Sequence, residues 1–112
     1  MNLEKHTRKR RRDRNHVIYQ LTVGSLRYVG VTAKTESTAL KSARTRAAKH
    51  FYRAHTEDKE WSLCSVLRLL EDKREIGVTV LEVIRGKSAA HRREVELRRL
   101  LRPELNTDRR GD

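Results

Sequence analysis

One carboxylate of this chain is placed where a helix should be apolar. Residues 89–101 have the pattern of a helix, and at about 100° per residue Glu94 lies inside its apolar stripe while Glu96 is turned well away. An isolated charge on a buried face is very costly, so Glu94 needs a partner. A salt bridge to an arginine of an earlier helix and a divalent metal ion would both serve, and the sequence leaves the two open. The apolar members of the stripe are Ala90, Leu97 and Leu101.

An arginine and a histidine lie four residues apart in an earlier segment. Residues 39–54 are predicted to form a helix capped by Ser37 or Thr38. Arg46 and His50 then lie one above the other at the edge of its apolar stripe and can address one ligand together. The stripe consists of Leu40, Ala43, Ala47 and Phe51, and the further basic residues around it are Arg44, Lys49 and Arg53.

Two tyrosines are brought together by a predicted hairpin. Residues 17–32 alternate apolar and polar side chains around Gly24-Ser25, which is the pattern of two antiparallel strands joined by a II′-type turn. In that register Tyr19 lies opposite Gly30, and Tyr28 is its diagonal neighbour on the same face. Gly30 has no side chain to cover the phenol. Strands also favour tyrosine for packing alone, so the hairpin by itself does not separate a site from a core.

Three further elements complete the predicted domain. A second helix is expected at about residues 61–71, with Trp61 as an anchor in the core, and a third strand at residues 77–84. Ser88 is predicted to cap the last helix, and Pro103 stops it. The lone Cys64 excludes an intramolecular disulfide and a cysteine-based zinc site, and its apolar context places it in the core.

The charge balance points to a polyanionic partner. Lys and Arg number 27 against 15 Asp and Glu, a formal net charge of +12, and nucleic acid is the expected polyanion. No apolar run is long enough for a membrane-spanning helix and no signal peptide follows the basic start, so we expect a cytoplasmic or nucleoid-associated protein that is not secreted and does not contact membranes. Residues 1–15 are expected to form a flexible basic arm along phosphates.

Together these residues resemble the GIY-YIG endonuclease family over residues 16–107. The first motif is similar to Val17-Ile18-Tyr19, with Val for the leading Gly, and the second to Tyr28-Val29-Gly30. The hairpin loop is shorter than is usual in the family, and the segment from Gly30 to Arg46 is longer than in its compact members, which leaves Arg44 as a rival to Arg46. Only Arg46 has a histidine four residues later. The later motif residues are Glu94, Pro103 and Asn106.

The resemblance implies an α/β (α+β) domain, a three-stranded antiparallel sheet flanked by helices in the order β-β-α-α-β-α. It also implies hydrolysis of DNA phosphodiesters with one Mg²⁺, for which Mn²⁺ can substitute, held by Glu94. Tyr19 would be the general base or would orient the water, supported by Tyr28, or the two roles are reversed. A phenol has a pKa near 10, so as a base it needs cations nearby.

The remaining roles also follow from the resemblance. Arg46 would supply positive charge and hold the scissile phosphate, His50 would assist proton transfer or contact phosphate, and Asn106 would orient the site. His6, His16 and His91 have no spacing that recommends them as ligands. Residues 108–112 are expected to form a short tail. The basic residues expected to contact nucleic acid are Arg8, Lys9, Arg10, Arg11, Arg12, Arg14, Arg44, Lys49 and Arg53.

Two other readings of the chain stay open. A non-catalytic nucleic-acid-binding protein with an idle nuclease-like site would carry the same basic surface, and a structural RNA-binding protein of ribosomal type would explain the charge equally well. RNA therefore remains open as a partner beside DNA. With no second domain to read a long target, we expect low sequence specificity, or dependence on a second copy of the chain or on another protein.

Overall fold

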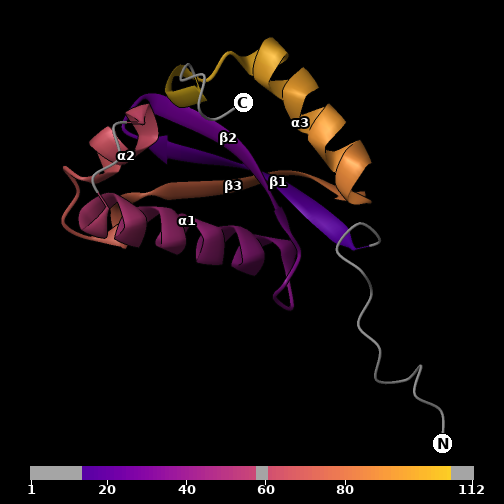
Figure 1. Ribbon diagram of the computed structural model, residues 1–112, viewed down its shortest axis with the longest axis horizontal. Coiled ribbons are helices and arrows are strands. Elements are labelled where there is room, and N and C mark those ends of the chain that lie inside the picture. The colour runs from indigo at the N-terminus through magenta and orange to yellow at the C-terminus, as the bar shows by residue number, and fades with distance from the viewer. Residues whose placement is uncertain (1–13, 58–60, 107–112) are drawn as a thin grey trace, which may run out of the picture.

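The computed structural model describes residues 14–57 and 61–106, which form a three-stranded antiparallel sheet with helices on both faces (Figure 1). The strand order is β2-β1-β3, so the first strand lies in the centre. The predicted α+β fold and its element order are confirmed. In chain order the elements are β1 (Asn15–Val23), β2 (Leu26–Ala33), α1 (Ala39–Thr56), α2 (Ser62–Leu67), η3 (Lys73–Glu75), β3 (Gly77–Arg85), α3 (Lys87–Leu101) and η4 (Glu104–Asn106).

The hairpin of β1 and β2 has the predicted register. Val23 pairs with Leu26, and Tyr19 pairs with Gly30. Gly24 has a φ of 60°, in the left-handed region that favours glycine, as the first position of a II′-type turn requires. The sheet therefore presents Tyr19 and Tyr28 on one face.

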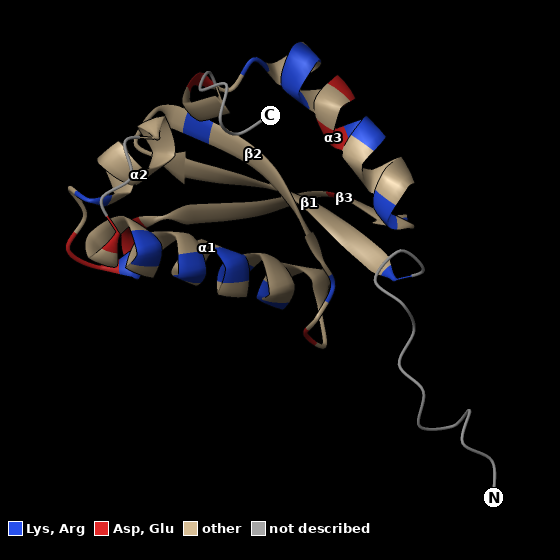
Figure 2. Ribbon diagram, in the orientation of Figure 1, with Lys and Arg blue, Asp and Glu red and all other residues tan. Residues whose placement is uncertain are grey.

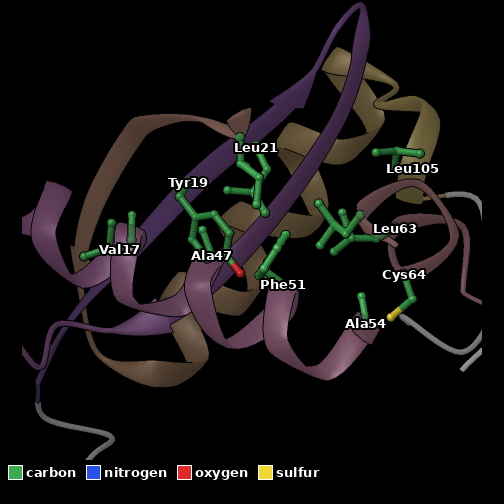
Figure 3. Close-up of a cluster of buried hydrophobic side chains, with 12 residues drawn as sticks. Val17, Tyr19, Leu21, Ala47, Phe51, Ala54, Leu63, Cys64 and Leu105 are labelled. Carbon is green, nitrogen blue, oxygen red and sulfur yellow. The ribbon is translucent and has the colours of Figure 1, made fainter. Parts of the chain in front are cut away.

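Helix α1 covers that face of the sheet. Thr38 caps it by accepting a hydrogen bond from the amide of Lys41, as predicted. Its buried side chains include Ala47 and Phe51, which pack with the Tyr19 ring in the larger of two apolar clusters (Figure 3). No helix in the described part of the chain has both the length and the apolar character needed to cross a membrane.

The opposite face of the sheet packs against α3. A smaller cluster joins Ile18 and Val29 of the sheet to Leu97 of α3. A β-bulge lies between Ile18 and Tyr19 on the β3 side, because Ile18 pairs with Glu82 and Tyr19 with Val80. Bulges increase strand twist and redirect side chains, and this one lies beside Tyr19. Glu82 holds α3 in place through an ion pair with Arg93 at 2.8 Å.

Four local predictions were wrong. Leu40 is 36% exposed and lies outside the buried stripe of α1. The second helix ends at Leu67, because the chain tightens into i→i+3 turns where Arg68 donates a hydrogen bond to the carbonyl of Ala54 in α1.

The start of α3 and the start of β1 also differ from the prediction. Gly86, not Ser88, is the N-cap of α3, because the chain turns there with a φ of 96° that a serine rarely adopts. Strand β1 begins at Asn15, which pairs with Arg85, so the last residue of the expected arm belongs to the sheet. The rest of that arm up to residue 13, and the expected tail, lie outside the described residues.

Candidate active site

The Tyr19 phenol is at the centre of a buried polar cluster between the sheet and α1. Its hydroxyl lies 3.1 Å from Nε2 of His50, and the two residues are only 1% and 5% exposed. Burial and the charge of Tyr28 raise the pKa of Tyr19. Burial and the charges of Arg46 and Arg53 lower the pKa of His50 to about 4. At neutral pH both groups are therefore uncharged, and with the imidazole hydrogen on Nδ1 the phenol donates to Nε2.

Arg46 adds a guanidinium to this pair. It lies one turn before His50 on α1, forms a hydrogen bond with the Tyr19 side chain, and its charge lowers the pKa of Tyr19 and of Tyr28. Arg46 thus supplies the positive charge expected of it, but desolvation outweighs that effect and the net pKa of the Tyr19 phenol is raised. The buried Nε of Arg46 has no hydrogen-bond partner in the described part of the chain, which leaves a donor for an anion.

The rival arginine lies elsewhere. Arg44 lines a separate groove between α1 and the start of β3, together with Lys73 and Arg74. The structure thus places Arg46, and not Arg44, beside the tyrosines. Arg53 is one turn beyond His50 and pairs with Glu57 at 3.5 Å, so it reaches the cluster by its charge alone.

Tyr28 and Gly30 form the β2 wall of the cluster. The Tyr28 ring centroid lies 6.4 Å from that of Tyr19 and 5.6 Å from that of His50. A Cβ atom on Gly30 would come within 2.6 Å of the Tyr19 hydroxyl and 2.9 Å of the Tyr28 ring, so only glycine fits there. Tyr28 keeps partial exposure, and it is therefore the phenol nearer to solvent.

Glu94 is buried, as the helical periodicity predicts, with an exposed fraction of 8%. Its negative charge raises the pKa of both tyrosines, so the carboxylate belongs to the same electrostatic environment. It forms an ion pair with Arg98, one turn further along α3. Glu96 is exposed and pairs weakly with Arg93 at 3.8 Å.

Asn106 acts on the backbone of the second tyrosine motif. Its Oδ1 accepts the amide hydrogen of Val29 at 2.6 Å, and its Nδ2 donates to the carbonyl of Val29 at 2.9 Å. Because Val29 lies between Tyr28 and Gly30, the asparagine fixes the strand edge that carries them. Both ends of its amide are engaged, which fits a residue that orients the site.

The structure also brings together two histidines that their spacing did not select. His16 at the start of β1 and His91 on α3 line one pocket with Arg46 and Lys49. Only the sheet topology could have shown this, because the two histidines are far apart in sequence. Arg14 lies beside the start of β1, and the other basic residues predicted in the arm, from Arg8 to Arg12, lie outside the described residues.

A metal ion would find one carboxylate in this cluster. No group of three or more His, Cys, Asp or Glu side chains gathers within residues 14–57 and 61–106. Mg²⁺ accepts one carboxylate when waters and substrate phosphates complete its octahedral shell. A single carboxylate would thus serve only a hydrated Mg²⁺ whose shell is completed by substrate, and not a metal site made by protein alone.

Comparisons of the chain with protein families, with curated proteins and with solved structures found no match. The resemblance to GIY-YIG endonucleases thus rests on the motif residues of the sequence.

Proposed function

We propose that this protein is a Mg²⁺-dependent DNA endonuclease with a site of the GIY-YIG type. The observation that carries the proposal is the convergence of Tyr19, Arg46 and His50 on one buried hydrogen-bonded cluster whose electrostatics include Glu94. These residues come from the central strand, from α1 and from α3. A stable core does not need a phenol, an imidazole, a guanidinium and a carboxylate in one place, whereas phosphodiester hydrolysis can use each of them.

In this proposal Arg46 binds the phosphate of the substrate. Its guanidinium matches two phosphate oxygens, and its buried Nε supplies a donor that no described residue uses. A bound phosphodiester would bring negative charge next to His50 and offset the arginine charges that lower the pKa of the imidazole. Binding would therefore prepare His50 to take up a proton.

Proton transfer falls to the Tyr19–His50 pair. The attacking water gives a proton to the Tyr19 oxygen while the phenol passes its own proton to Nε2 of His50, so the positive charge ends on the imidazole. The water oxygen forms the new bond to phosphorus, the bond to the 3′ oxygen breaks, and that oxygen takes a proton from solvent. Tyr28, on the solvent side, orients the water.

Glu94 would hold Mg²⁺ in this arrangement. When bound, the ion supplies positive charge to the phosphate oxygens in the transition state. The Arg98 guanidinium competes for the same carboxylate, so metal binding should be weak until phosphate oxygens complete the shell.

Plasmid nicking with Mg²⁺ or with EDTA tests the proposal. We expect wild type and Glu96→Gln to nick supercoiled DNA with Mg²⁺, and Glu94→Gln to be slower by roughly 100-fold or more, since a metal ion contributes several kcal/mol of transition-state stabilisation. Thermal melting of both variants controls for folding. Absence of nicking by wild type with every divalent metal tried would refute the nuclease.

One observation favours a second function, nucleic-acid binding without cleavage. Tyr19 is almost fully covered, and Glu94 already has an ion-pair partner, as in a satisfied structural cluster. In that case wild type binds DNA and leaves plasmids intact. Replacement of Glu94 then lowers stability, and there is no nicking activity for it to change.

A further inference from the structure

A second polar pocket lies next to the candidate active site and shares Arg46 with it. It has a volume of ≈ 210 Å³ and is lined by the start of β1, the end of β2, the first half of α1 and the first turns of α3. That volume is several times the roughly 30 Å³ of a water molecule and below the range of about 300 Å³ upward for small-molecule sites. The pocket fits a phosphate group with its waters better than a whole nucleotide.

The lining of this pocket is basic. Arg46 and Lys49 reach it from α1, Lys87 and His91 from α3, and His16 from β1. None of the described residues that line it is acidic. Figure 2 shows Lys and Arg mainly on the helices, with few on the strands. A pocket with this lining favours an anion over a cation.

His16 carries a nitrogen that the protein does not satisfy. The residue is only 3% exposed, and its Nδ1 lies 2.9 Å from the carbonyl of Arg14, to which it donates. Its buried Nε2 has no hydrogen-bond partner among the described residues. A buried polar atom without a partner is costly, and here it belongs to a side chain that lines the pocket. Because Nδ1 carries the hydrogen, Nε2 is an acceptor, and a water held between it and a phosphate oxygen would supply the missing partner.

Lys87 occupies a position at which a positive charge is unfavourable for helix stability. It is the first residue of α3, and no acidic residue stands in the first turn. The positive end of the helix dipole disfavours a lysine at that position. No ion pair in the described structure involves Lys87, so its charge is available to a ligand in the pocket.

We propose that this pocket is a second phosphate site, in which His16, Lys49, Lys87 and His91 bind a backbone phosphate of the nucleic acid next to the phosphate held by Arg46. Binding of phosphate does not depend on the proposed function, but its assignment to a nucleic-acid backbone rests on it. The pocket would fix the position of the nucleic-acid strand relative to the two tyrosines, as phosphate contacts do in nucleic-acid complexes.

The first test follows the imidazole nitrogens of the full chain by NMR. Inorganic phosphate at about pH 7 should shift the His16 and His91 resonances in a saturable way, while chloride at the same ionic strength should not. Lys87→Gln should weaken this binding roughly tenfold, the effect of one charge-assisted hydrogen bond. Arg92→Gln removes one charge from the exposed surface of the same helix and should keep wild-type binding. Equal shifts with chloride, or equal effects of the two variants, would overturn the site.

The second test replaces inorganic phosphate by a short DNA duplex. The same two histidines should shift, and Lys87→Gln should lower the slope of binding against salt by about one phosphate contact, with Arg92→Gln unchanged. A response to inorganic phosphate but not to DNA overturns the assignment to a nucleic-acid backbone. Plasmid nicking is measured separately, with wild type and Glu94→Gln. A nuclease that lacks the phosphate site would nick DNA without the histidine shifts. A phosphate site on a protein that is not a nuclease would give the shifts without nicking.

Discussion

Ile18 and Tyr19 are neighbours on the central strand and are equally hidden, with exposed fractions of 0% and 1%, yet their surroundings differ. Ile18 faces α3 and packs with Val29 and Leu97 in an apolar cluster. Tyr19 faces α1, where a hydroxyl, an imidazole and a guanidinium are buried together. Apolar packing tolerates many substitutions of similar volume. A buried polar group that loses its hydrogen-bond partner destabilises the protein, because it is left unsatisfied.

The difference between the two faces extends to charge. His50 is held neutral on the α1 side by burial and by two arginines, and folding must work against its protonation. The apolar cluster on the α3 side has no titratable member. The α1 side should therefore respond to pH, to small changes of volume and to loss of single polar atoms in ways that the apolar cluster does not.

The largest expected effect is on stability at acid pH. The pKa of His50 is lowered from 6.5 to about 4, so between these values the unfolded chain binds a proton that the folded chain does not. Stability should fall as the pH falls through this window, by roughly 3 kcal/mol in total. Denaturant unfolding from pH 7 to 4 measures this. His50→Gln should flatten the dependence, and His55→Gln, exposed on the same helix, should not; a wild-type slope in His50→Gln would show that other groups cause it.

A smaller effect is expected for Gly30→Ala. The added methyl group would lie 2.6 Å from the Tyr19 hydroxyl, so one ring must move. Overpacking of this kind costs about 1–3 kcal/mol, and the displaced phenol should slow nicking as well. Ser25→Ala is the control in the same hairpin, because Ser25 is exposed in the turn. Denaturant unfolding of the two variants should differ; equal stability would mean that the β2 wall is loosely packed.

Local patterns in the sequence were sufficient to predict much of this arrangement. The turn residues at Gly24-Ser25 predict the register of the hairpin, and therefore that Gly30 faces Tyr19. A period of 100° predicts that Glu94 points inward and Glu96 outward. Both conclusions need only the geometry of one strand pair or one helix.

Properties that depend on tertiary structure could not be predicted in this way. The sequence left an ion pair and a metal ion open for Glu94, and the ion pair with Arg98 depends on which side chains surround the carboxylate. The meeting of His16 and His91 requires that β1 be the central strand and that α3 begin beside it. The balance of burial against cations at Tyr19 depends on how deeply the ring is packed.

The most direct measurement of the central claim compares nicking by Tyr19→Phe and Ile18→Val. Tyr19→Phe deprives Nε2 of His50 of its donor, at about 1–3 kcal/mol, and Ile18→Val removes one methyl group from the other face, at about 0.5–1.5 kcal/mol. Both variants should stay folded well below their melting temperatures. If the cluster is an active site, Tyr19→Phe nicks supercoiled plasmid with Mg²⁺ at least about 100-fold more slowly than wild type, while Ile18→Val stays within about twofold. Equal nicking by the two variants at equal folded fractions would contradict the claim and make the cluster part of the core.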